Sequence, residues 1–218
     1  MDAANMENLS RPIPIVTVIL LFVGISVFLI PETIPWLIYD RSAILSGEVW
    51  RIFTGHMVHF SGSHLLYDLL VLGITGSIIE RRNHLSYGWF CVLSAMCISL
   101  TLLVFEPNMH FYGGFSGIAF GGFIYLALDG FRESGPWQQV CLIAFLLGMS
   151  KLFLELIGQW PESIIGASGS FVSVPLSHLV GSLIALIFQM RYIKTAYDEL
   201  IPLVVSPVDA KQHAKSLL

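Results

Sequence analysis

Residues 113–128 read GGFSGIAFGGFIYLAL, an apolar run that opens on two glycines and carries Ser116 near its start. The run is shorter than the roughly 20 residues that a helix needs to span a bilayer. Its small residues, including Gly121 and Gly122, favour close packing between helices. We therefore expect a short helix, about residues 115–128, that packs tightly among other helices, although a serine in such a stretch is common by chance.

Five further apolar runs flank this one and predict a helix each. They are residues 13–30, 63–79, 87–105, 140–157 and 175–193. Hydrophobic residues make up 55% of the chain and charged residues 12%, against about 25% charged in a soluble domain. The mean hydropathy of +0.76 agrees. The sequence thus predicts an all-α, polytopic membrane protein with six transmembrane helices.

One domain, residues 13–193, is expected between a cytoplasmic N-terminal segment, 1–12, and a polar cytoplasmic tail, 194–218. The first apolar run is followed by Pro31-Glu32-Thr33 and not by a small-residue cleavage site, so we expect a retained helix. The net charge of −4 gives no basic field for nucleic acid. Three cysteines in apolar runs indicate small buried side chains and no disulfide framework: Cys91, Cys97 and Cys141.

The connections between the runs differ in character. Residues 31–62 mix Trp36, Trp50, Phe53 and Phe60 with charges, a pattern typical of a segment lying in the membrane interface. Short polar turns are expected at 80–82 and 129–133, and a flexible glycine-rich loop at 166–170.

The distribution of lysine and arginine predicts the orientation. If the N-terminus is cytoplasmic, the outer loops hold only Arg41 and Arg51. The cytoplasmic side then holds Arg11, Arg81, Arg82, Arg132, Arg191, Lys194, Lys211 and Lys215. Both termini are therefore expected in the cytoplasm.

This topology brings separate polar residues to one depth. The second, fourth and sixth runs all enter from the outer face, and each carries polar side chains in its first turns: His64 and Asp68, then Ser116, then His178. None of these residues is a lysine or arginine, so the predicted orientation does not depend on them. Their agreement in depth predicts a shared site just below the outer surface.

Ser116 and His178 are the candidate nucleophile and base. Gly114 and Gly117 beside Ser116 let backbones approach closely, and an amide at a helix N-terminus can donate to a developing oxyanion. Small residues after His178, Gly181 and Ala185, would let its helix pack against that of Ser116. A structural histidine bonded to a carbonyl is the alternative. No acid is clearly placed to orient His178, so we expect a dyad.

Two other polar pairs have helical i,i+4 spacing. His64 and Asp68 would flank the oxyanion or hold each other. Together with His56 and His59, His64 suggests a possible metal site. No Cys or carboxylate spacing supports such a site, so neither a metal nor a cofactor is expected. Lys151 and Glu155 form an interfacial ion pair or line a substrate entry.

Five motifs in this order resemble the rhomboid family across nearly the whole chain. They are Trp50-Arg51 in the first loop, His64 to Asp68 in the second helix, Glu80-Arg81-Arg82 after it, Gly114-Phe115-Ser116-Gly117, and His178-Leu179-Val180-Gly181. The resemblance implies the six-helix rhomboid fold and a serine protease with Ser116 and His178 as its dyad. It also implies an oxyanion site made by the Ser116 amide and His64, a cavity that opens outward, and a first loop embedded in the outer leaflet.

Three residues depart from the family pattern. Asp68 stands where most rhomboids have asparagine, and an ionised aspartate only accepts hydrogen bonds. It would donate to an oxyanion only if protonated, or would orient His64 instead. Phe120 replaces a tyrosine, which keeps stacking under the histidine but loses a hydroxyl, and Ala185 replaces a glycine.

The compact chain and its His-x-x-x-Asp variant are also similar to the rhombosortase branch. That likeness implies substrates anchored by a C-terminal Gly-Gly motif, an apolar helix and a basic tail, cut at the outer face of the bacterial inner membrane. Two other functions stay open: a catalytically silent rhomboid-like protein that binds membrane clients, and a small transporter or cofactor bundle. The absence of internal repeats in the sequence argues against a transporter.

Overall fold

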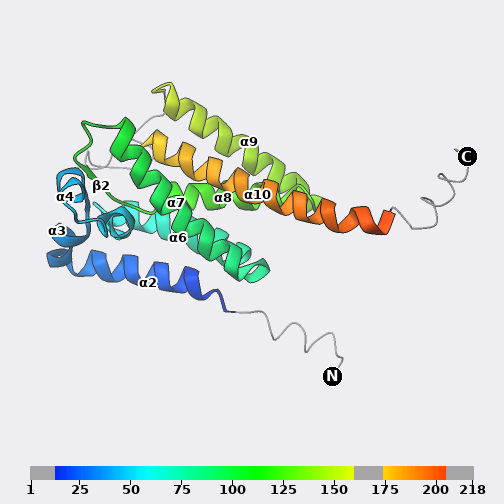
Figure 1. The fold of residues 1–218 in the computed structure, drawn as a ribbon, viewed down its shortest axis with the longest axis horizontal. Helices are drawn as coiled ribbons and strands as arrows, with labels where there is room; N and C mark the ends of the chain where they lie inside the picture. Colours follow the sequence, from blue (N-terminus) through cyan, green and yellow to red (C-terminus); the bar gives the residue numbers. More distant parts are fainter. Residues whose placement is uncertain (1–12, 160–173, 205–218) are drawn as a thin grey trace, which may run out of the picture.

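The structure is a computed structural model that describes residues 13–159 and 174–204. Its long helices form a bundle (Figure 1) and cover the six predicted runs: α2 (Ile15–Leu29), α6 (Gly62–Arg82), α7 (His84–Phe105), α8 (Ser116–Gly130), α9 (Pro136–Leu156) and α10 (Pro175–Val204). By length and composition α6, α7 and α9 can cross a membrane. Helix α2 and the following Pro31–Leu37, bent by 95° relative to each other, would add a fourth if the pair is one span. The prediction of a helical membrane bundle is confirmed, whereas six spans stay a prediction.

The connection between α2 and α6 is built from short elements. These are η1 (Pro31–Thr33), α3 (Ile34–Leu37), β1 (Tyr39–Asp40), α4 (Arg41–Leu45), α5 (Arg51–Thr54) and η2 (Gly55–Met57). Strand β1 pairs antiparallel with β2 (Phe111–Tyr112), so the all-α prediction needs one small correction. Two-residue strands carry no alternating pattern that a sequence could reveal.

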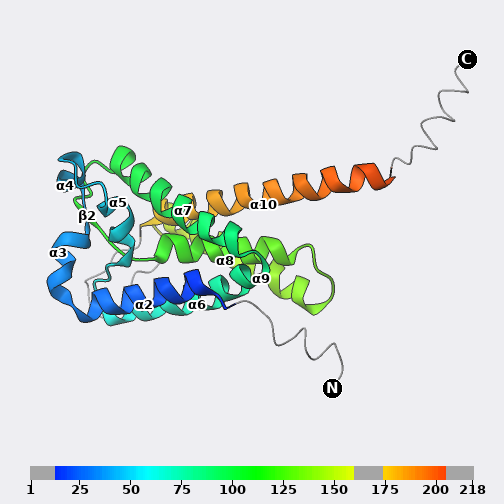
Figure 2. The ribbon, with the colours of Figure 1, turned by 60° about the horizontal axis from the view of Figure 1, so that its bottom comes forward.

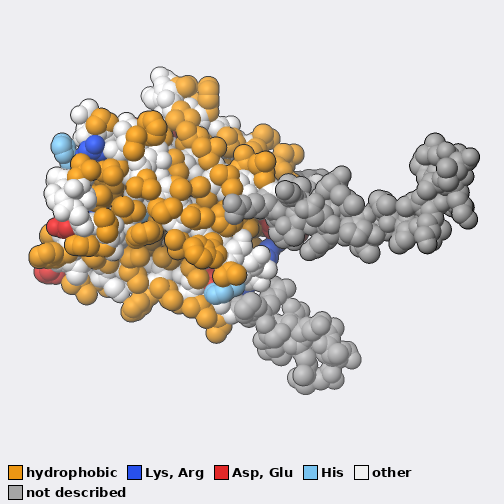
Figure 3. All heavy atoms as spheres, viewed as in Figure 1, with side chains coloured by type: hydrophobic (Ala, Val, Ile, Leu, Met, Phe, Trp, Pro, Cys, Tyr) orange, Lys and Arg blue, Asp and Glu red, His pale blue; other side chains and the backbone are white. Residues whose placement is uncertain are grey.

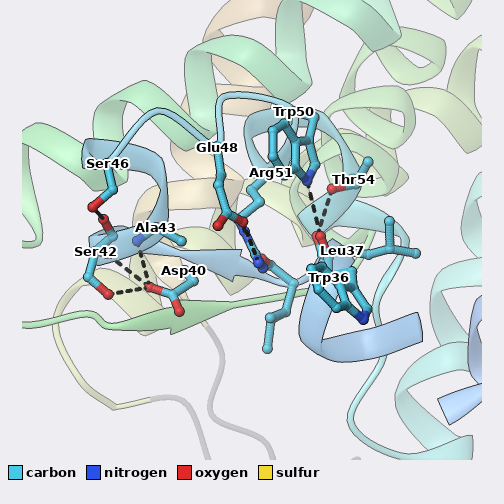
Figure 4. A network of polar contacts seen from close by, with 11 residues as sticks. Trp36, Leu37, Asp40, Ser42, Ala43, Ser46, Glu48, Trp50, Arg51 and Thr54 are labelled. Carbon is cyan, nitrogen blue, oxygen red and sulfur yellow. Dashed lines mark hydrogen bonds and ion pairs between the residues drawn. The ribbon is translucent and has the colours of Figure 1, made fainter. Parts of the chain in front are cut away.

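Arg51 and Trp50 hold this connection together (Figure 4). The Arg51 side chain is buried and donates to the Glu48 carboxylate at 2.7 Å and to the Ile38 carbonyl at 2.8 Å. The Trp50 indole donates to the Trp36 carbonyl at 3.1 Å. The aromatic rings of the connection remain exposed, as an interfacial segment requires: Trp36, Trp50, Phe53 and Phe60.

Helix α8 lies at the centre of the bundle, as the rotated view shows (Figure 2). It packs against α6, α7, α9 and α10. A methyl group added at Gly121 would lie 2.6 Å from the Gly181 carbonyl oxygen of α10, so the two backbones are almost in contact. Apolar side chains cover most of the face of the bundle that Figure 3 shows. The exposed apolar side chains include Phe22 of α2 and Leu147 of α9. Lipid is the solvent that such a surface fits.

The predicted turn at residues 80–82 is wrong, because α6 continues through Arg82. Glu80 is buried there and accepts hydrogen bonds of 2.8 Å from the amides of Val16 and Thr17 and from the Thr17 hydroxyl. His84 Nδ1 lies 2.8 Å from the same carboxylate. The carboxylate thus satisfies the first amides of α2 and complements its positive end.

Replacing Glu80 with glutamine should lower the free energy of unfolding of the purified protein by about 1–3 kcal/mol, and with it the midpoint temperature of unfolding. The reason is that a charged acceptor of three hydrogen bonds is lost in a buried site. The turnover of the remaining folded protein should not change, since Glu80 lies at the far end of α6 from His64. Thermal unfolding in detergent and cleavage per folded molecule measure the two effects. An unchanged midpoint would contradict the capping role.

Two other predicted boundaries need correction. Helix α8 runs through Gly130, where a turn was expected from 129. Helix α10 runs to Val204, beyond the predicted end at 193, because residues 194–201 include the strong helix formers Ala196 and Leu200. The predicted glycine-rich loop at 166–170 lies outside the described residues.

Candidate active site

The start of α8 is shaped by the glycine turn before it. Strand β2 leads into Gly114, whose φ of +115° lies in the left-handed region that favours glycine. Ser116 is the first residue of α8, so its amide has no acceptor within the helix. Helices α6 and α10 begin at the same end of the bundle (Figures 1 and 2). The polar residues in the first turns of α6, α8 and α10 therefore lie at this end of the bundle, as the sequence predicted.

His64 and Asp68 lie against this glycine turn. A methyl group at Gly114 would stand 2.5 Å from His64 Nε2 and 3.2 Å from Asp68 Oδ2. The two side chains also face each other, with 3.3 Å between His64 Nε2 and Asp68 Oδ2. A side chain at 114 would thus push them away from the backbone that precedes Ser116.

A second histidine, His59, contacts Asp68. Its Nε2 lies 3.2 Å from Asp68 Oδ2 and its Nδ1 lies 3.2 Å from the Met57 carbonyl oxygen. The sequence pointed to His59 as a possible metal ligand and as part of the stretch that leads into the second-helix motif, but nothing in its spacing linked it to Asp68. Asp68 Oδ2 therefore lies between the rings of His59 and His64, where an ionised carboxylate can accept a hydrogen bond from either ring and so orient His64.

His56 is hydrogen-bonded to helix α7. Its Nε2 lies 3.0 Å from the Ala95 carbonyl oxygen and 3.0 Å from the Ser99 hydroxyl, both on α7. Burial lowers the pKa of His56 to about 4, so the ring is neutral at pH 7. Among the side chains that the structure describes, no three from His, Cys, Asp or Glu are grouped to hold a metal ion.

His178 is positioned by contacts between α8 and α10. A methyl group at Gly117 would lie 3.0 Å from the Ser177 carbonyl oxygen, and one at Gly181 would meet the Gly117 carbonyl. The His178 ring centre lies 4.9 Å from that of Phe120, one turn after Ser116. Ala185, one turn beyond Gly181, is completely buried. These contacts bring together the helical turns that carry Ser116 and His178.

The expectation that no acid stands beside His178 is wrong. Glu155 of α9 reaches inward, and its Oε2 lies 2.8 Å from His178 Nδ1. Its Oε1 accepts a hydrogen bond of 2.5 Å from Lys151, the ion pair that the spacing predicted. The sequence showed the pair and its outer depth, but not that α9 turns Glu155 toward α10.

Tyr112 completes the surroundings of Ser116 and was also missed. The residue is buried, and its ring stands edge-on to Tyr39 and His56. Burial raises the pKa of Tyr112 to about 12, an effect that the hydroxyls of Ser177 and Ser116 partly oppose. A neutral phenol thus lies beside Ser116 and Ser177. Its only sequence signal was its position four residues before Ser116.

The fold and the site define a helical membrane protein with serine, histidine and carboxylate groups gathered at one end of the bundle. The rhomboid domain family matches residues 46–195, so the chain belongs to the rhomboid family. Together with its apolar helices, this membership makes it a multi-pass membrane protein.

Several bacterial relatives are similar to this chain. Rhomboid protease GlpG of Salmonella choleraesuis strain SC-B67 is 29% identical over 138 residues, which cover 62% of this chain and 49% of the relative. Proteins of the same name from Salmonella newport strain SL254 and Salmonella typhimurium strain LT2 are 30% identical over 132 residues, 59% of this chain and 47% of each relative. The chain thus spans about half the length of these curated relatives.

Proposed function

We propose that this protein is an intramembrane serine endopeptidase in which Ser116 is the nucleophile and His178 its base. The observation that carries the proposal is the close contact between α8 and α10 at Gly117 and Gly181. This contact brings the helical turn of Ser116 next to the helical turn of His178. The relatives named rhomboid protease GlpG support it.

The geometry supports a standard acyl-transfer sequence. The Ser116 hydroxyl attacks the substrate carbonyl while His178 accepts the proton, which it then gives to the leaving amine. The amide of Ser116 and the ring of His64 would donate to the oxyanion. Water attacks the acyl-enzyme, and His178 again moves the proton.

We further propose six membrane spans, cytoplasmic termini, an inner-membrane location and a site that opens to the outer side. Substrates are transmembrane or C-terminally anchored proteins whose segments unwind near the outer face, since a helical peptide bond is shielded. The rhombosortase likeness makes Gly-Gly anchors the first class to test. Glycine-rich segments unwind readily, which supports that choice.

The test is co-expression with a tagged Gly-Gly-anchored protein and, separately, with a generic rhomboid substrate. We expect loss of the anchor with the wild type and none with Ser116→Ala, read from the mass of the product. A product whose mass matches hydrolysis supports water as acceptor, and added mass indicates transfer to an amine.

Cleavage of the generic substrate alone would remove the Gly-Gly specificity and keep the protease. Equal cleavage by wild type and Ser116→Ala would contradict the proposal. No cleavage of either substrate, with all variants folded, would favour a silent protein that binds membrane clients.

A further inference from the structure

The carboxylate of Glu155, which contacts His178, is buried and paired through both of its oxygens. The Glu155 side chain is 2% exposed, and each of its oxygens has a partner: Lys151 Nζ on Oε1 and His178 Nδ1 on Oε2. A buried carboxylate is costly unless it is paired and hydrogen-bonded. The lysine supplies the countercharge from one helical turn away, so one carboxylate oxygen is left for the histidine.

We infer that Glu155 is a positioning residue that holds His178 for proton transfer, so that the site is a Glu155–His178–Ser116 relay. The inference rests on the proposed protease function and deepens it. It replaces the two-residue dyad that the sequence predicted.

The chemistry follows from the two distinct nitrogens of the imidazole. A carboxylate beside Nδ1 accepts a hydrogen bond from the Nδ1–H group and so keeps that proton on Nδ1. The lone pair on Nε2 is then free to take the proton of Ser116. The same carboxylate stabilises the imidazolium that forms when His178 carries two protons. The Phe120 ring, 4.9 Å away, fixes the ring plane from another side.

Lys151 has a supporting place in this arrangement. Its ammonium group lies 5.0 Å from the centre of the Phe120 ring, the same ring that His178 contacts. Lys151 of α9 and His178 of α10 therefore both contact the Phe120 ring, while Glu155 links the two side chains.

The test compares two buried glutamates that each lie 2.8 Å from a histidine Nδ1. Glu155→Gln keeps the shape and removes the charge at His178. Glu80→Gln makes the same change at His84, at the other end of the bundle. We expect Glu155→Gln to lower kcat by roughly 10²- to 10⁴-fold with KM little changed, because Glu155 acts through His178 and not on the substrate. Glu80→Gln should leave kcat unchanged per folded molecule.

Glu155→Asp keeps the charge on a shorter side chain and should retain more activity than Glu155→Gln. If Glu155→Gln does not fold, Glu155→Asp still tests the inference, because it keeps the negative charge. Near wild-type kcat in folded Glu155→Gln would overturn the inference, as would equal losses in Glu155→Gln and Glu80→Gln. Ser116→Ala in the same assay separates the two proposals: if it is inactive and Glu155→Gln is fully active, only the relay fails.

Discussion

Replacement of His178 by alanine should reduce kcat by roughly 10⁴-fold or more, because the serine hydroxyl is a weak nucleophile without a base. The ring is buried, contacts Phe120 and is hydrogen-bonded to Glu155. It moves the proton both when Ser116 attacks and when the amine leaves, so its loss slows two steps. Turnover of a fluorogenic transmembrane substrate in detergent or liposomes measures the effect, normalised to folded protein.

The control is the double variant Ser116→Ala with His178→Ala. Residues that act as a unit are not additive, so the double variant should be no slower than either single one. A His178→Ala protein within tenfold of the wild type would show that the ring is a structural histidine.

The second large effect is expected from Gly181→Ala. The added methyl group meets the Gly117 carbonyl of α8, a backbone group that cannot rotate away. The helices must separate, at a cost of about 1–3 kcal/mol in the free energy of unfolding. Because the separation lies one turn from His178, cleavage should also fall by about 100-fold, the sensitivity expected for a misplaced catalytic group.

Gly73→Ala in α6 is the matched control. Its methyl group would lie 3.5 Å from Leu21 Cδ1, an ordinary contact with a flexible side chain. This variant should unfold and cleave like the wild type. Equal behaviour of the two alanine variants would contradict the close approach of α8 and α10.

The sequence could predict the helices and the depth of the site because both follow from periodicity and charge. Ser116, His178 and His64 lie in the first turns of apolar runs that enter from one side. Alternation of the helices then places all three at one end of the bundle.

Glu155 could not be predicted as a partner of His178, because the link depends on how α9 is rotated about its axis. Helix α9 is mostly exposed along its length, so its apolar residues define no clear buried face. An i,i+4 ion pair looks the same in sequence whether it faces lipid headgroups or the interior. Asp68 was ambiguous for a similar reason, since its second neighbour, His59, comes from a loop.

The most direct test of the central claim is covalent labelling of the purified wild-type protein with a fluorophosphonate, followed by mass mapping of the modified peptide. We expect one adduct, on Ser116, that is absent in Ser116→Ala and strongly slowed in His178→Ala. An adduct on another serine, or equal labelling of the wild type and Ser116→Ala, would contradict Ser116 as the nucleophile.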